Sequence, residues 1–432
     1  MRAWPFLVLG ALLVVGGIVA PGAPPAFAQG EAAPRRETHL GAGSCAASAC
    51  HGDTKPKANE YTTWIQHDEH SEAYLHLTRG DGPKIAKRLG LSQPAREAPE
   101  CLSCHAAAPQ LYDHGDRYDM RWGVSCEICH GGSTQWLGPH AAPGWKEKSW
   151  GHKTALGMRD LSTPEQRVAL CAGCHVGGQG NRTVDHDLIA AGHPPLFFDA
   201  SAFMALKEPQ WVHWTDETDL TQRTWFLGQV ANLVAYLGRI ERSAEDEKRW
   251  PDYAVFDCYS CHHDLDKDGH YATTEAVGPI GRPPFDAAFT SVLGRALAEM
   301  KPAAAQGLQT LGESLSAAYR NRDRAAVRES AASGASQARQ FATAVESLDQ
   351  AAASRILAWF DEHLDATEGL DHRIPRHEAL QIAWAIHALV PNRQAQGFRA
   401  AYDELADSLS ADGDYDPGVF AKKARAAIAA GR

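Results

Sequence analysis

Apolar residues recur with helical spacing along the second half of the chain. In the segment HEALQIAWAIHALVP, residues Ala379, Ile382, Ile386 and Leu389 fall on one face, and Pro391 follows the last of them. Spacings of three and four residues place side chains on one side of an α-helix, and a proline cannot continue it. The pattern predicts an amphipathic helix that ends before Pro391.

A second helix is predicted at the C-terminus. Phe420, Ala424 and Ile428 repeat along one side, and Asp416 followed by Pro417 precedes them. Aspartate is a preferred N-cap residue, and proline is favoured at the first helical position. The segment from about Phe285 to Arg432 is Ala-rich and free of cysteine. We expect it to form an antiparallel helical bundle.

The first half combines short helical segments with many glycines and prolines. TPEQRVALCAGCH opens with Thr163, Pro164 and Gln166 in the positions of an N-cap, a first helical residue and a capping box. No segment alternates apolar and polar residues for long, so β-structure should be scarce. The predicted fold is mainly α. Its domains are a signal peptide (1–28), a linker (29–38), a cysteine- and histidine-rich domain (39–284) and an Ala-rich helical domain (285–432).

The N-terminus has the pattern of an export signal. Arg2 precedes the apolar run FLVLGALLVVGGIVA (6–20), and AFA (26–28) supplies small residues around a cleavage point before Gln29. The run is short for a transmembrane span, although an uncleaved anchor is the alternative. No other stretch is long and apolar enough to cross a bilayer. These features predict a periplasmic protein with no stable membrane span after cleavage.

Cysteine usage identifies the chemistry. Of the ten cysteines, eight lie in four C-x-x-C-H motifs, the pattern for covalent attachment of c-type haem. The motifs are CLSCH (Cys101, Cys104), CEICH (Cys126, Cys129), CAGCH (Cys171, Cys174) and CYSCH (Cys258, Cys261). Two thiols add to the vinyl groups of one haem, and the following histidine is its proximal ligand. A zinc site uses cysteine pairs too, but it does not require a histidine after every pair.

The remaining two cysteines lie in CAASACH, where Cys45 and Cys50 are followed by His51. Because every other cysteine is in a haem motif, we interpret this segment as a fifth site with a longer spacer, and a disulfide is the alternative. The prediction is five haems, which would make residues 39–284 a pentahaem cytochrome c domain. The proximal histidines would be His51, His105, His130, His175 and His262.

The sixth ligand of each iron separates a carrier from an enzyme. Sixteen further histidines are available to close the five sites, whereas methionine is rare, with Met120, Met158 and Met204 as the formal candidates. A second axial ligand on every iron suits electron transfer, and an open position allows chemistry on a small molecule. The formal net charge of −11 makes nucleic acid an unlikely partner and favours protein partners with basic patches.

The segments around the motifs resemble the multihaem cytochromes of the cytochrome c-554 family, related in haem arrangement to hydroxylamine oxidoreductase and pentahaem nitrite reductase. The resemblance covers about residues 40–265. It rests on WIQHDEHSEAY, CEICHGGSTQWLGPH, CAGCHVG, DHDLIAAGHPPLFF and CYSCHHDL. It implies that His70, His140 and His193 are distal ligands of neighbouring haems.

Other histidines stay open. His263 directly follows a motif histidine, and it is either a distal ligand or not a ligand. His186 lies seven residues before His193, and it is either a distal ligand or a solvent-facing residue. For His67 the alternative to a ligand role is an exposed position on a helix, and for His152 it is stacking on a porphyrin. The histidines of the cysteine-free half are expected at the surface or in the core.

Two departures from the family matter. The family's type member has four haems with two-residue spacers, and pentahaem nitrite reductase has a lysine after its catalytic C-x-x-C, where this chain has histidine in every motif. The leading hypothesis is an electron carrier between redox proteins. The alternatives are an oxidoreductase with one open haem, expected at the 101–105 site and acting on a small nitrogen or oxygen compound, and an electron-wiring subunit of a larger complex.

Overall fold

The computed structural model describes residues 38–432 apart from 56–57, 108–111, 181, 208–217, 249, 263–282, 368–373 and 411–414. The predicted signal peptide and His263 therefore lie outside the described residues. The described part is mainly α, as expected. Its one sheet pairs β1 (Thr38–His39) with β2 (Asp113–His114) in parallel, with Thr38 opposite Asp113.

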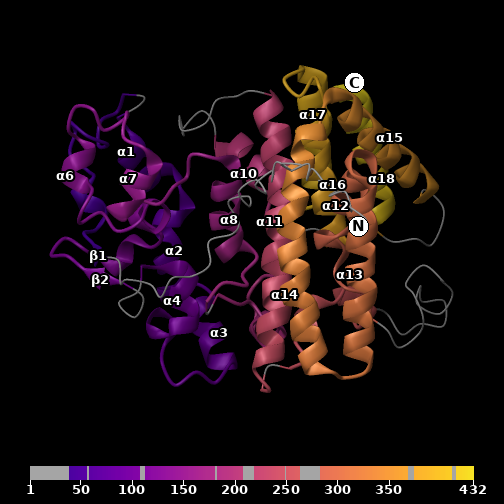
Figure 1. Ribbon diagram of the computed structural model, residues 1–432, viewed down its shortest axis with the longest axis horizontal. Coiled ribbons are helices and arrows are strands. Elements are labelled where there is room, and N and C mark those ends of the chain that lie inside the picture. The colour runs from indigo at the N-terminus through magenta and orange to yellow at the C-terminus, as the bar shows by residue number, and fades with distance from the viewer. Residues whose placement is uncertain are drawn as a thin grey trace, which may run out of the picture.

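Short helices form the cysteine-rich part of the molecule (Figure 1). They are α1 (Glu60–His67), α2 (Ala73–Thr78), α3 (Gly82–Arg88), α4 (Pro99–His105), α5 (Cys126–His130), α6 (Leu137–His140), α7 (Trp150–Ala155), α8 (Pro164–His175), α9 (His186–Ala190) and α10 (Ala200–Lys207). Single 3-10 turns accompany them: η1 (Ala42–Ser44) before α1, then η2 (Glu69–Glu72), η3 (Ala95–Glu97) and η4 (Met120–Trp122) between the short helices, and η5 (Tyr253–Val255) and η6 (Cys258–Ser260) later in the chain.

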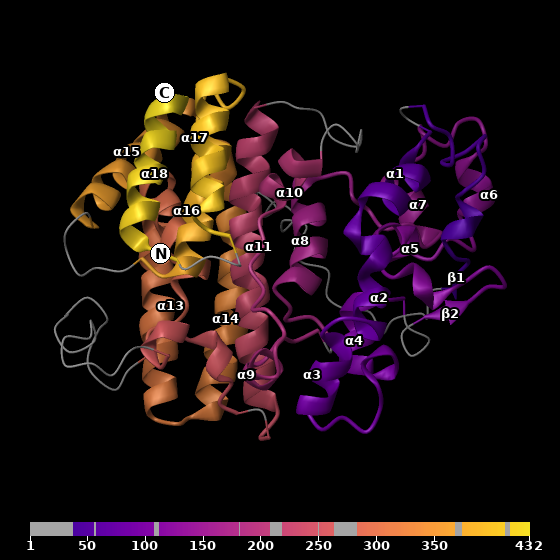
Figure 2. The same cartoon turned by 180° about the vertical axis from the view of Figure 1, so that it is seen from behind.

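Long helices form the other part. They are α11 (Thr218–Glu245), α12 (Ser291–Met300), α13 (Pro302–Arg320), α14 (Arg324–Phe341), α15 (Gln350–Thr367), α16 (Arg376–Leu389), α17 (Gln396–Asp407) and α18 (Pro417–Gly431). Two 3-10 turns, η9 (Ala287–Phe289) and η10 (Ala342–Ser347), join them. Within this part, helix α11 is next to the short helices, against α8 on one side and α14 on the other (Figures 1 and 2).

The helix ends agree with their sequence signals. Thr163 and Gln166 form the capping box of α8, and the Asp416 side chain accepts hydrogen bonds from the backbone N–H groups of Gly418 and Val419 at the start of α18. In α16, the four predicted apolar residues are at most 1% exposed, and the helix ends at Leu389. These helix predictions are confirmed.

The described residues form two hydrophobic cores. The smaller one, which includes Tyr74, Leu77 and Leu102, packs the short helices α2 to α4, and the larger one extends from Val168 in α8 to Ile428 in α18. Trp225 and Phe226 in α11 lie fully buried at its centre. The core therefore crosses the boundary expected at 284/285, which stays a prediction. Among the described helices, none combines the length with the apolar composition needed to span a membrane.

Close backbone contact fixes α8 against α11. Gly177 and Gly178 follow α8 with φ angles of +96° and +82°, a region that favours glycine. A Cβ at Gly178 would lie 2.1 Å from the carbonyl oxygen of Ala235 in α11. The end of the 171–175 motif is thus anchored on the longest helix of the protein.

Candidate functional site

The cysteine motifs lie at helix ends. Helices α4, α5 and α8 each end at the histidine of a C-x-x-C-H motif, and η6 carries the first cysteine of the last motif. The segment 45–51 is a turn after η1, closed by a hydrogen bond from the backbone N–H of Cys50 to the carbonyl of Ala47 at 2.8 Å. We call 45–51, 101–105, 126–130, 171–175 and 258–262 the first to fifth sites.

Four motif histidines face a second histidine from elsewhere in the chain. The ring pairs, with their centroid separations, are His51–His140 at 6.2 Å, His105–His193 at 6.4 Å, His175–His70 at 5.7 Å and His262–His186 at 6.2 Å. The structure thus brings together the residues that sequence reasoning proposed separately as proximal and distal ligands, including His186. Sequence spacing alone did not assign any of these pairs.

The separations fit a metal ion between the rings. An imidazole nitrogen binds a metal at about 2 Å, so two opposite nitrogens on one ion lie about 4 Å apart. The Nε2 atoms of His175 and His70 are 3.5 Å apart. The donor set, two cysteines and two imidazoles at each of four sites, suits a covalently attached, bis-histidine haem.

Hydrogen bonds orient the imidazoles. Nδ1 of five rings lies within hydrogen-bond distance of an oxygen, which leaves the opposite nitrogen, Nε2, to bind a metal. The contacts are His51 with Glu60 Oε2 (2.9 Å), His70 with Asp68 Oδ1 (2.9 Å), His105 with the Ala73 carbonyl (2.8 Å), His140 with the Leu137 carbonyl (2.5 Å) and His193 with the Pro194 carbonyl (2.8 Å). Metal-binding histidines typically have such a partner, because it fixes the tautomer and the ring orientation.

Burial keeps two of these rings neutral. It lowers the pKa of His175 to about 4, with a further contribution from the neighbouring His70, and it also lowers the pKa of His105. A neutral imidazole has the lone pair that binds a metal. Phe198 stacks on the His175 ring at 4.7 Å, and Phe203 approaches His70 at 6.1 Å.

Thiol contacts show which sites are neighbours. The thiols of Cys45 in the first site and Cys126 in the third interact, which lowers the pKa of Cys45 and raises that of Cys126. The thiols of Cys174 in the fourth site and Cys104 in the second interact in the same way, which lowers the pKa of Cys174 and raises that of Cys104. The charge of Cys174 also acts on Cys129 of the third site. The sites therefore adjoin in the order first, third, fourth, second.

The fifth site is connected to the second through α9. His186 begins this helix and His193 follows it, with the backbone N–H of His193 bonded to the Leu188 carbonyl at 3.1 Å. Cys50 of the first site and Cys258 and Cys261 of the fifth are exposed. Both ends of the series of sites therefore reach the surface.

The third site contains a buried carboxylate that sequence reasoning missed. Glu127, between Cys126 and Ile128, is 1% exposed. It accepts hydrogen bonds from the backbone N–H groups of Leu40 (2.9 Å), Gly41 (2.7 Å) and Ser133 (2.9 Å), and from the Ser133 hydroxyl. Its acidic side chain within the motif was the available signal. His130 ends α5, and its carbonyl accepts a hydrogen bond from the Arg159 backbone N–H at 2.7 Å.

Strand pairing places two more histidines side by side, His39 opposite His114. His39 is fully buried and stacks on Tyr112 at 4.0 Å, and His114 stacks on Tyr118 at 3.5 Å. Sequence reasoning gave neither residue a role, because no motif or spacing distinguishes them. His39 directly precedes Leu40 and Gly41, whose backbone N–H groups donate to Glu127 of the third site, and His114 is the strand partner of His39.

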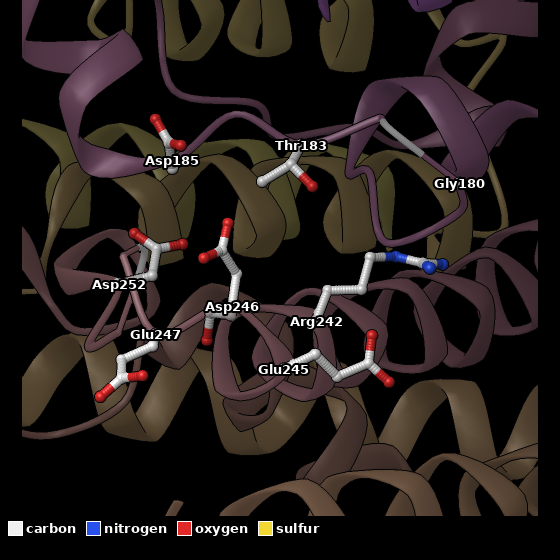
Figure 3. A pocket seen from close by; sticks show the side chains of 9 residues that line it. Gly180, Thr183, Asp185, Arg242, Glu245, Asp246, Glu247 and Asp252 are labelled. Carbon is white, nitrogen blue, oxygen red and sulfur yellow. The ribbon is translucent and has the colours of Figure 1, made fainter.

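An acidic pocket of about 490 Å³ lies beside the fifth site (Figure 3). Its lining combines the end of α11 with the segments before α9 and η5. The residues are Gly180, Thr183, Asp185, Arg242, Ser243, Glu245, Asp246, Glu247 and Asp252. Asp252 holds the start of α9, because its Oδ1 accepts a hydrogen bond from the backbone N–H of His186 at 3.1 Å.

Comparison with known proteins finds a similarity in part of the chain. Residues 44–131 match the family described as cytochrome c554 and c-prime. The matched segment contains the first three sites and His70. No curated protein and no solved structure matches the chain.

Proposed function

We propose, from the match of residues 44–131 to the cytochrome c554 family, that the whole chain is an exported pentahaem cytochrome c that passes electrons between redox proteins. The family implies covalent c-type haem and electron transfer. The number of haems, the ligand pairs and the periplasmic location are our proposal. The observation that carries it is the facing of four motif histidines by four further histidines.

The chain supplies the attachment and the axial ligands. The ten cysteines would hold five haems, and the motif histidines would be the proximal ligands. His140, His193, His70 and His186 would close the first, second, fourth and fifth sites respectively. When bound, haem would supply one-electron chemistry at each site, and at the four sites with a second histidine the two imidazoles would leave no position on the iron for a substrate.

The order of the sites supports conduction. Thiol contacts join the first, third, fourth and second sites, and α9 joins the second to the fifth. The two ends of this series are exposed and the sites between them are more covered. Such a series takes up and releases electrons at separate surfaces, as a carrier requires.

The second site does not favour substrate chemistry. We expected the open haem of an enzyme there, but His193 faces His105 at a ring separation of 6.4 Å. A bis-histidine site at this position weakens the enzyme alternative. It agrees with the leading hypothesis of a carrier.

Charge suggests the kind of partner. The formal net charge is −11, and five carboxylates line the pocket beside the fifth site. Opposite charges steer association between proteins and fix their orientation. We propose that a redox partner with a basic face docks near the fifth site.

Ligand variants of the haem-loaded protein test the proposal. We expect His70→Ala, His140→Ala, His186→Ala and His193→Ala each to convert one low-spin ferric haem to a high-spin or water-ligated form, measured by electron paramagnetic resonance. Removing an axial imidazole weakens the ligand field at one iron only. The matched control is His152→Ala, because His152 is exposed and next to Trp145.

The outcome distinguishes the hypotheses. An unchanged spectrum in any of the four variants removes that histidine from the ligand set. Steady consumption of nitrite or hydroxylamine by the unmodified protein would replace the carrier by the enzyme.

A further inference from the structure

The groups behind the paired imidazoles differ in charge. Backbone carbonyls lie at Nδ1 of His105, His140 and His193, whereas carboxylates lie at Nδ1 of His70 and His51. A carbonyl and a carboxylate both fix the ring orientation. A carboxylate also draws the N–H proton more strongly and makes the opposite nitrogen a stronger electron donor.

Asp68 is the more constrained of the two carboxylates. It is 8% exposed and is the N-cap of η2. The same oxygen, Oδ1, accepts a hydrogen bond from the His70 backbone N–H at 3.0 Å and lies 2.9 Å from His70 Nδ1. Because one oxygen fixes both groups, the His70 ring is held with Nε2 toward His175, 3.5 Å away.

Glu60 is more accessible to water. Its side chain is 26% exposed and that of its partner, His51, is 42% exposed. Water screens a charge at such a position, so its influence on a nearby metal is smaller than that of a buried carboxylate. The two contacts have the same length, 2.9 Å, and differ mainly in burial.

We propose that Asp68 is a positioning residue that lowers the reduction potential of the haem at the fourth site, and that Glu60 has a smaller effect of the same sign at the first. The inference rests on the proposed function. A more basic axial imidazole and a buried negative charge both favour ferric over ferrous iron. The reaction is the one-electron Fe³⁺/Fe²⁺ couple, in which no proton is transferred.

The consequence is a difference between two neighbouring sites. The second site, whose two imidazoles contact carbonyls, adjoins the fourth through Cys104 and Cys174. An electron is then held less tightly at the fourth site than at the second. Asp68 thus biases electrons toward the second site and, through α9, toward the exposed fifth site.

The test is a potentiometric titration of the haem-loaded protein and its Asp68→Asn variant. Asparagine is as good an N-cap as aspartate, so η2 is preserved while the charge is removed. Mutation of a group that supports a metal ligand typically changes metal affinity or activity 10–100-fold. We expect the reduction equilibrium of one haem to shift about tenfold toward the reduced form, which corresponds to about 59 mV for one electron.

Two further variants make the test specific. Asp119→Asn is the matched control, because Asp119 likewise caps a 3-10 helix, η4, through the Arg121 backbone N–H, and pairs with Arg121. It should leave every potential unchanged. Asp68→Glu, which keeps the charge, should restore most of the original potential.

The results separate this inference from the proposed function. Suppose that Asp68→Asn keeps all haems low-spin. If it then shifts no haem's reduction equilibrium constant more than about twofold, or shifts all reduction potentials equally, the inference is wrong and the ligand assignment stands. If His70→Ala leaves the low-spin signals intact, His70 is not an axial ligand and the proposed function fails at the fourth site.

Discussion

Removal of the Glu127 side chain should destabilise the third site strongly. This carboxylate accepts hydrogen bonds from three backbone N–H groups, those of Leu40, Gly41 and Ser133. In Glu127→Ala these N–H groups lose their acceptor, and because Gly41 and Ser133 are buried, water does not replace it there. Each buried unsatisfied group costs about 1–3 kcal/mol, so the loss should be about 3–6 kcal/mol with incomplete additivity.

Glu127→Gln separates the effect of charge from that of the hydrogen bonds. An amide oxygen in the place of Oε1 keeps the bonds from Leu40 and Ser133, while the amide nitrogen would face the Gly41 N–H, 2.7 Å from Oε2 in the unmodified protein. One donor is then unsatisfied, and the expected loss is about 1–3 kcal/mol. The variant should therefore be intermediate in stability.

The assay is urea unfolding of the haem-loaded protein followed by circular dichroism, combined with hydrogen exchange at the Gly41 and Ser133 amides. Glu100→Ala is the control, because Glu100 is exposed and precedes Cys101 of the second site. Exposed substitutions usually change stability by less than about 0.5 kcal/mol. Equal stability of the alanine and glutamine variants, or a loss below about 1 kcal/mol for alanine, would refute the reasoning.

Three further predictions concern the haem count, a buried carboxyl and the α8–α11 contact. The mass of the denatured haem-loaded protein should fall by one haem in the Cys45→Ser/Cys50→Ser variant; an unchanged haem content would make the chain tetrahaem. Burial raises the pKa of Asp199, so its contribution to stability is greatest at low pH and decreases as the pH rises through the folded pKa. Thermal unfolding should therefore show Asp199→Asn gaining stability relative to the unmodified protein as the pH is raised, and a constant difference would contradict this. Gly178→Ala should lower the thermal midpoint, because the added Cβ would lie 2.1 Å from the Ala235 carbonyl oxygen; an unchanged midpoint would show that the loop yields without cost.

Local signals predicted the helices well. The capping box at Thr163, the N-cap at Asp416 and the apolar face of α16 depend on residues within one or two turns of each other, and the structure agrees with all three. The long helix α11 was not predicted as the element that joins both parts of the molecule. Its surroundings come from α8 and α14, which are remote in sequence, and apolar periodicity carries no information on which helices pack together.

The candidate site shows the same limit. A C-x-x-C-H motif identifies two thiols and one imidazole because their spacing is local, but the second imidazole comes from up to 105 residues away, as with His70 and His175. Which histidine faces the motif imidazole depends on which segment the fold places next to that imidazole. His186 illustrates this, since Asp185 caps α9 and Asp252 holds the His186 backbone N–H, and together they set the position from which its ring meets that of His262.

The carboxylates behind the imidazoles were beyond sequence reasoning for a related reason. Asp68 stands two residues before His70, and the same spacing occurs wherever an aspartate caps a short turn, as Asp119 does for Arg121. What distinguishes Asp68 is that its cap oxygen also contacts a ring whose other nitrogen faces His175. We propose that this capping residue, which would usually only begin a turn, also acts on an axial ligand, and the difference between Asp68→Asn and Asp119→Asn measures that effect directly.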